Sequence, residues 1–230
     1  MTEHVLFFDI DGTMLSTGGA GQRAMELALA EEFRIADPFQ QILTAGRTDR
    51  GIEDEIFERY SIPATQASRQ RFMRAYLDRL PHCLQQLPGG LLPGVQELLQ
   101  GLSLRSDVHL SLLTGNYFEG ALIKLRHFGI AGFFEDSGGF GDHHADRNDV
   151  AHLALSVVRQ RLQRPVQGSE AVVIGDTPAD VRCARAIGAR AVAVATGVYT
   201  LQQLQTTEPD HVFETLGATE DVISKLLTKF

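Results

Sequence analysis

Near its amino terminus the chain reads VLFFDIDGT, residues 5–13, in which an apolar run stops at two acidic residues. Short continuous apolar runs that end at turn residues are typical of strands buried on both faces of a parallel sheet. We therefore expect a buried strand over residues 5–8. Asp9 and Asp11 would follow its carboxyl end, and Gly12 would let the chain turn.

The same pattern recurs along the chain, where apolar runs over residues 109–113, 171–174 and 191–195 each end in small or polar residues. Between these runs, apolar residues spaced three and four apart predict amphipathic helices within residues 95–102, 122–128 and 150–157. Alternating strands and helices predict an α/β fold with a Rossmann-like, doubly wound parallel sheet. Ligands bind such sheets beyond the carboxyl ends of the strands.

Residues 16–92 lack the alternation of strands and helices predicted for the rest of the chain. They contain long helical patterns over residues 21–33, 50–60 and 66–80, without a convincing buried strand between them. We expect an inserted α-helical cap domain over residues 16–92, and an α/β core domain built from residues 1–15 and 93–230. Glycine, serine and proline at residues 16–21 and 87–90 are suited to hinges between the two.

Composition narrows the class of protein. A net charge of −8, without a cluster of lysine and arginine, argues against a nucleic-acid partner. The apolar runs are shorter than the ~20 residues of a membrane span, and the first residues lack the pattern of a signal peptide. Cys83 and Cys183 form no CxxC motif and are expected to be reduced thiols. These features predict a cytoplasmic protein that does not bind membranes, and they leave open whether it is a monomer or homodimer.

Asp9 and Asp11 have a chemical use together. One carboxylate can attack a phosphorus atom, while the second protonates the leaving oxygen and then activates water. A magnesium ion would be needed, because carboxylates and phosphate otherwise repel each other. Two aspartates in a DxD pattern more often belong to a solvated turn than to an active site. Evidence from other motifs in the chain is therefore needed to favour the catalytic interpretation.

A second acidic motif, VVIGDTPAD at residues 172–180, ends another apolar run. Thr177, Pro178 and Asp180 form a helix start that resembles a capping box, which is a structural explanation for Asp180. Capping does not explain Asp176, which precedes the helix at a strand end. Its carboxylate is expected to face whatever lies above the sheet.

With both acidic motifs in place, the sequence resembles the haloacid dehalogenase-like (HAD) hydrolase superfamily, and most closely its phosphoglycolate phosphatase-like members with a helical cap. The resemblance implies Asp9 as nucleophile and Asp11 as general acid and base. It implies Mg²⁺ held by Asp9, Asp176 and the backbone carbonyl of Asp11, with Asp180 orienting either the water around the metal or the basic residue. It also implies that Thr114, at the end of the 109–113 run, binds the transferring phosphoryl group. Gly115 and Asn116 follow it as candidate substrate-binding residues.

The third motif of the family usually contains a lysine. This chain has Lys124, Lys225 and Lys229. Lys124 lies about two turns inside a helix that starts near Tyr117, and a rise of 1.5 Å per residue places it roughly 10 Å from the strand ends. We therefore expect Arg147 to supply the positive charge, because it precedes a helix after the glycine-rich residues 138–141. The alternative is a surface arginine that pairs with a neighbouring aspartate.

The segment GRTD at residues 46–49 resembles the part of a cap that closes over the substrate. Arg47 lies in this segment. It is a candidate to bind the second anionic or polar end of the substrate. The alternative is a helix-start turn, in which Thr48 or Asp49 caps the following helix.

The sequence therefore predicts a Mg²⁺-dependent phosphatase for a small phosphorylated metabolite, acting through an aspartyl-phosphate, with phosphoglycolate as the family-level expectation. A phosphomutase of the same fold stays open, as does a binding protein that has lost catalysis. Asp11 and the acidic metal site disfavour halide removal, because displacement of a halide from carbon needs no magnesium. The absence of lysine from residues 16–92 disfavours a phosphonatase that works through a Schiff base.

Overall fold

The computed structural model describes residues 4–36, 38–39, 42–134 and 137–228. Within these ranges a parallel sheet of six strands has the order β5-β4-β1-β6-β7-β8. The strands are β1 (His4–Phe8), β4 (Val108–Leu113), β5 (Gly138–Gly139), β6 (Ala171–Gly175), β7 (Arg190–Val194) and β8 (His211–Phe213). The predicted α/β fold with a doubly wound parallel sheet is confirmed.

The register of the central strands sets the position of the acidic residues. Phe8, the last residue of β1, lies opposite Leu112 of β4 on one side and Ile174 of β6 on the other. The backbone N–H of Asp9 continues this pairing, since it donates to the carbonyl of Ile174 at 3.0 Å. The three strands consequently end at the same edge of the sheet.

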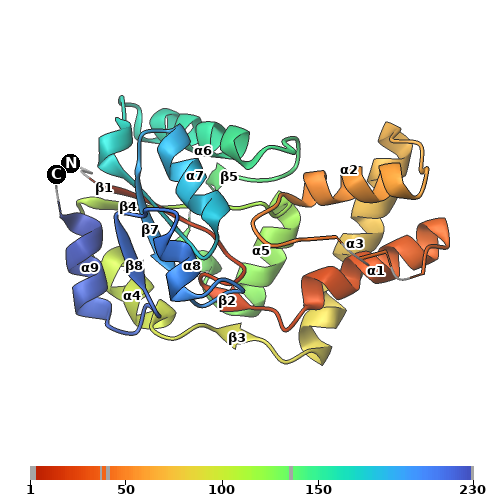
Figure 1. Ribbon diagram of the computed structural model, residues 1–230, viewed down its shortest axis with the longest axis horizontal. Helices are drawn as coiled ribbons and strands as arrows, with labels where there is room; N and C mark the ends of the chain where they lie inside the picture. The colour runs from red at the N-terminus through yellow and green to blue at the C-terminus, as the bar shows by residue number, and fades with distance from the viewer. Residues whose placement is uncertain (1–3, 37, 40–41, 135–136, 229–230) are drawn as a thin grey trace.

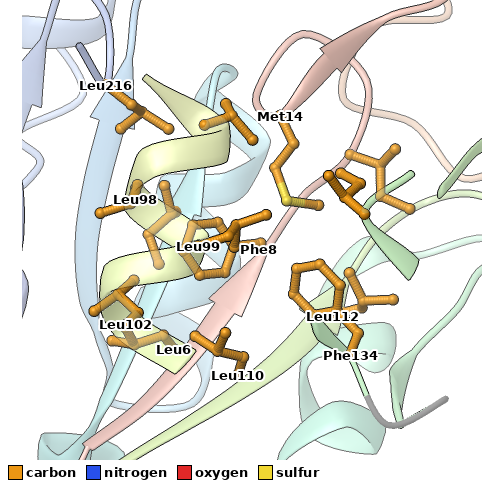
Figure 2. Close-up of a cluster of buried hydrophobic side chains, with 14 of the residues drawn as sticks. Leu6, Phe8, Met14, Leu98, Leu99, Leu102, Leu110, Leu112, Phe134 and Leu216 are labelled. Atoms are coloured by element: carbon orange, nitrogen blue, oxygen red, sulfur yellow. The ribbon is translucent and has the colours of Figure 1, made fainter. Parts of the chain in front are cut away.

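Helices cover both faces of the sheet (Figure 1). One face packs against α4 (Val95–Ser103) and α9 (Thr219–Leu227), and the other against α6 (Arg147–Leu162) and α7 (Pro178–Ala186). Figure 2 shows Leu98, Leu99 and Leu102 of α4 packed against Leu6 and Phe8 of β1. The remaining helices of this part are α5 (Phe118–His127), α8 (Leu201–Gln205) and the short 3-10 turns Ala131–Phe133 and Gly168–Glu170.

Three helices form a separate unit at the right of Figure 1. They are α1 (Ala20–Phe33), α2 (Asp49–Arg59) and α3 (Gln66–Gln86), and they share a hydrophobic cluster that is distinct from the two clusters on the sheet. The chain leaves the sheet through β2 (Leu15–Ser16) and returns through β3 (Gly90–Leu91). These two strands pair antiparallel, so the two crossing points lie side by side.

The structure differs from the sequence prediction at α3, β8 and α9. The helix expected to end at Leu80 continues through Pro81 to Gln86, because Cys83 and Leu84 are buried in the cluster of the three helices. Packing here outweighs the unfavourable proline. The β8 strand and the α9 helix were not predicted, because residues 211–213 are a run too short to stand out.

None of the helices in the described ranges combines the length and the apolar character that a membrane span requires. Cys83 and Cys183 are both buried and free, as expected of reduced thiols.

We predict that Leu99→Ala lowers the free energy of unfolding by about 2–5 kcal/mol, because Leu99 is fully buried between α4 and the sheet and its removal leaves a cavity. Leu104 follows the same helix and is 88% exposed, so Leu104→Ala is the matched control, with an effect of at most about 0.5 kcal/mol. Urea unfolding followed by circular dichroism measures both. Equal effects would show that α4 does not pack as described.

Candidate active site

The carboxyl ends of β1 and β6 bring two aspartates together. Asp9 follows β1 and Asp176 follows β6, and both side chains are buried. Two glycines leave room for Asp176, since a Cβ atom would lie 2.4 Å from its Oδ2 at Gly12 and 1.8 Å at Gly197. Gly12 also has a φ of +80°, which side chains other than glycine rarely adopt. The turn expected at Gly12 thus serves to seat Asp176.

Asp180 joins this pair from the first turn of α7. Ligand atoms of Asp9, Asp176 and Asp180 all lie within 4.8 Å of one another. The predicted capping box is present, because an oxygen of Asp180 accepts from the backbone N–H of Thr177 at 3.0 Å and from its hydroxyl at 2.7 Å. The other oxygen of Asp180 pairs with Arg147. Asp180 therefore caps its helix and faces the site at the same time.

Burial and mutual repulsion raise the pKa values of Asp176 and Asp180. The pKa of Asp176 rises to about 8, mainly through burial and then through the charges of Asp180 and Asp9. The pKa of Asp180 rises to about 6 through burial, although the Arg147 guanidinium lowers it. The hydroxyl of Thr13 donates to Asp176 at 2.9 Å and offsets part of the effect. One guanidinium thus compensates only part of the negative charge of these three buried carboxyl groups.

Arg147 is the cation within this cluster. It is the first residue of α6, its side chain is buried, and its Nη2 lies 2.9 Å from Oδ2 of Asp9 while also pairing with Asp180. Burial lowers its pKa, but the charges of Asp180 and Asp9 outweigh burial and raise it above the ordinary value. The structure therefore places Arg147 where the sequence analysis expected it, rather than in a surface pair.

The distance argument against Lys124 was wrong. Its Nζ lies 2.6 Å from Oδ2 of Asp11 and also donates to Oδ1 of Asn116. Lys124 lies in the second turn of α5, but helix side chains lean toward the amino end of their own helix. The long side chain of Lys124 therefore reaches the strand ends, although its backbone lies further along the helix.

The segment after β4 binds Asp11 as well. The amide nitrogen of Asn116 donates to Oδ2 of Asp11 and to Oγ1 of Thr114, each at 2.8 Å. Thr114 is fully buried, and its hydroxyl oxygen accepts from the side chain of Asn116. Thr114 is not among the described residues that line the cavity. The carboxylate of Asp11 is consequently held by Asn116 and Lys124, apart from the cluster of three aspartates.

The three-helix unit is docked directly on this segment. The N–H of Asp49 donates to the carbonyl of Gly115 at 2.7 Å, and Oδ2 of Asp49 accepts from the N–H of Tyr117 at 2.8 Å. A Cβ atom at Gly115 would lie 2.1 Å from the carbonyl oxygen of Arg47, so this close approach requires glycine. A third bond joins the hydroxyl of Tyr117 to Glu53 at 2.7 Å.

Docking encloses a cavity of about 340 Å³ between the two units. The sheet side contributes mainly polar residues, namely Asp9, Asp11, Asn116, Lys124, Arg147 and Asp176. The helical side contributes a mixed surface, which includes Gln22, Met25, Phe39, Arg47, Asp49 and Tyr76. The predicted site residues that line this cavity therefore come from both units.

Arg47 does not present a free charge to the cavity. Its guanidinium pairs with Glu55 and donates to the carbonyl of Gly51 at 2.8 Å. Thr48 caps α2 by accepting from the N–H of Gly51, as the alternative reading of this segment expected. Arg47 thus lies at the predicted place, but its charge is already matched.

Asp49, Tyr76 and Tyr117 were not selected from the sequence. Asp49 was seen only as a helix start, and the two tyrosines belong to helical patterns in which aromatic residues usually indicate packing. Contacts between segments distant in sequence, such as Asp49 with Tyr117, give no local signal.

Comparisons with known proteins agree with this architecture. Residues 6–185 match the family model described as haloacid dehalogenase-like hydrolase. The chain is 30% identical over 228 residues to a phosphoglycolate phosphatase of Caulobacter vibrioides, covering 96% of this chain and 91% of the relative.

Solved structures show the same fold. A mutant of CbbY from Rhodobacter sphaeroides in complex with xylulose-(1,5)bisphosphate superposes with a TM-score of 0.72 and 22% identity, covering 94% of this chain and 96% of that one. A hydrolase from Pseudomonas syringae superposes with a TM-score of 0.70 and 19% identity, covering 99% of this chain and 100% of that one.

The chain belongs to the haloacid dehalogenase-like hydrolase family, which confirms the resemblance drawn from its motifs. Within that family it is an enzyme, a phosphoric monoester hydrolase.

We predict that Asp49 makes the free energy of unfolding fall between pH 4 and 7. Burial raises its pKa from 3.8 to about 7, although Lys124 and the N–H of Tyr117 lower it while Asp11 and Asp142 raise it further. In this window the unfolded chain has released the proton that the folded protein keeps, so rising pH favours unfolding by up to ~1.4 kcal/mol per pH unit.

Asp49→Asn removes this contribution, so its stability relative to wild type should rise as the pH rises from 4 to 7. Urea unfolding at pH 4.5 and 6.5 measures the difference, with exposed Asp78→Asn as the control. A constant difference between variant and wild type across these pH values would contradict the prediction.

Proposed function

We propose that this protein is a Mg²⁺-dependent phosphatase that hydrolyses a small phosphomonoester through an aspartyl-phosphate on Asp9. The observation that carries the proposal is the arrangement around Asp9 at the end of β1. Its carboxylate lines the cavity beside Arg147 and Asp176, and Asp11 stands two residues further along. A nucleophile, a second carboxylate and a cation are thus grouped at one edge of the sheet.

In the proposed reaction an oxygen of Asp9 attacks the phosphorus atom and the bond to the ester oxygen breaks. Asp11 in its neutral form gives its proton to the leaving oxygen. Asp11, now ionised, then takes a proton from water, and the resulting hydroxide attacks the phosphorus atom. The bond to Asp9 breaks, which releases inorganic phosphate and restores both aspartates.

Two basic side chains support these carboxylates. Arg147 contacts Asp9 at 2.9 Å and can bind phosphoryl oxygens while it holds the nucleophile in place. Lys124 and Asn116 both contact Oδ2 of Asp11, so they fix the orientation of the proposed acid and base. Lys124 also stabilises the ionised carboxylate that remains after Asp11 has donated its proton.

The residues present fit a divalent cation. Asp9, Asp176 and Asp180 offer convergent, buried oxygen ligands of the kind that Mg²⁺ prefers, and Arg147 balances only part of their charge. By the family resemblance, Asp9, Asp176 and the backbone carbonyl of Asp11 would hold the ion, with Asp180 adjacent. When bound, the ion supplies the positive charge that allows a carboxylate to approach an anionic phosphoryl group.

We further propose that residues 16–92 act as a cap on the core formed by residues 1–15 and 93–230. The helices of the cap have their own hydrophobic cluster, and the paired β2 and β3 strands connect them to the core. The docked arrangement would exclude water during phosphoryl transfer. Relatives that are phosphoglycolate phosphatases make a phosphoglycolate-like metabolite the first substrate to consider.

We predict that Asp9→Asn reduces Mg²⁺-dependent phosphate release to below about a hundredth of wild type, because an amide cannot act as the nucleophile. The assay follows inorganic phosphate from a panel of small phosphomonoesters, with and without EDTA, and magnesium should restore the activity that EDTA removes. Asp107→Asn is the matched control, since Asp107 precedes β4 at the opposite edge of the sheet.

Release that survives Asp9→Asn would rule out this nucleophile. Phosphate retained on wild-type enzyme, without release from any ester, would instead indicate a phosphomutase.

We predict that Arg147→Met and Lys124→Met each lower kcat by at least about tenfold, because each removes the cation that holds one of the two reacting carboxylates. This replaces the expectation from helix geometry that Lys124 would be dispensable. Lys225→Met, at an exposed lysine of α9, is the control and should leave kcat unchanged. If Lys124→Met retained full kcat, its contact with Asp11 would have no part in the reaction.

A further inference from the structure

The hydroxyl of Tyr76 is a buried polar group, unpaired within the described residues, on a residue that lines the cavity. Tyr76 lies on α3, its side chain is fully buried, and it lines the cavity between cap and core. Within the described part of the chain its oxygen has no hydrogen-bond partner. Buried hydroxyl groups are normally paired, because the loss of water bonds is otherwise uncompensated. A molecule in the cavity would supply the missing partner.

The ring of Tyr76 is held rigidly, so its hydroxyl has a defined position. It stacks on Phe72 at a centroid distance of 6.4 Å and meets Tyr117 edge to face at 6.2 Å. On the core side, a Cβ atom at Gly120 would lie 3.1 Å from the hydroxyl oxygen. Burial and the charges of Asp49 and Asp11 raise its pKa well above the ordinary value, so it stays a neutral donor.

The charges on the cap side of the cavity do not favour a second anion. Asp49 contributes a carboxyl group and no cation, and the guanidinium of Arg47 is matched by Glu55. The ammonium of Lys124 is matched by Asp11, and the amide of Gln22 donates to Glu26. Backbone amides at the amino end of α1 add donors, which suit a hydroxyl oxygen as well as an anion.

A hydroxyl group meets these conditions, since it can accept from Tyr76 and donate to a carboxyl oxygen such as that of Asp49. The volume of about 340 Å³ lies within the range of pockets for small molecules.

We propose that Tyr76 is a specificity-determining residue, whose hydroxyl donates to a hydroxyl oxygen of the substrate. The preferred substrate is then a polyol or sugar phosphate, rather than a carboxylate-bearing ester such as 2-phosphoglycolate. This inference rests on the phosphatase function proposed above and names its substrate class.

The test compares kcat/KM for three four-carbon esters of the same length. Erythritol 4-phosphate carries hydroxyl groups, 4-phosphoerythronate adds a carboxylate, and butyl phosphate has neither; 2-phosphoglycolate is assayed beside them. Wild-type enzyme should prefer erythritol 4-phosphate over each of the others by at least about tenfold.

Tyr76→Phe should lower kcat/KM for erythritol 4-phosphate by at least about tenfold, mainly through KM, and change that for butyl phosphate by less than about twofold. A merely structural role would lower both alike. Tyr60→Phe, at a tyrosine of the same unit outside the cavity lining, is the matched control. The wild-type ranking tests the substrate class even if the Tyr76 variant does not fold.

A wild-type preference for 4-phosphoerythronate or 2-phosphoglycolate would overturn the inference, as would equal loss on all esters in Tyr76→Phe. Hydrolysis of butyl phosphate that depends on Mg²⁺ and Asp9 reports separately on the proposed function. If that activity persists while discrimination is absent, only the substrate class is wrong. If it is also absent, the phosphatase proposal fails as well.

Discussion

Repulsion between carboxylates is the constraint around which this structure is arranged. Asp9, Asp176 and Asp180 meet at one buried point, where water cannot screen their charges. Arg147 reaches the cluster from the first residue of α6 and pairs with two of the three aspartates. Folding thus assembles a site with excess negative charge, which the sheet and its two covering layers hold together. Such a site is suited to bind a cation, and a bound cation would allow an anionic phosphoryl group to approach.

The cap is connected to the same edge of the sheet. Its Asp49 bonds to the backbone of Gly115 and Tyr117, immediately after the strand whose end contributes Asn116 to the site. The contacts of the three-helix unit with the core and the contact of Asn116 with Asp11 consequently share one short segment of chain. The charge of Lys124 also lowers the pKa of Asp49. The docked position of the cap and the charge around Asp11 are therefore coupled electrostatically. The core contributes most of the polar residues of the cavity, and the three-helix unit contributes a mixed polar and apolar wall.

This division separates the proposed reacting groups from the wall of the cavity. The proposed reacting groups lie at strand ends, where the register of β1 with β4 and β6 leaves little freedom. The wall of the cavity consists of side chains on helices with a separate hydrophobic cluster, which can change without disturbing the sheet. In this chain the wall presents Tyr76 and Asp49, together with an Arg47 whose charge is already used.

The sequence by itself determined the parallel sheet, the helical insert and the placement of Asp9, Asp176 and Arg147, because each follows from a local pattern such as a buried run or a helix start. Tertiary structure alone decided that Lys124 reaches Asp11, since the lean of a helix side chain and the path of α5 beside the cap set that distance. It alone also decided that α3 continues past Pro81 and that Tyr76 faces the cavity. These outcomes depend on which distant segments pack together, and packing between elements leaves no periodic signal along the chain.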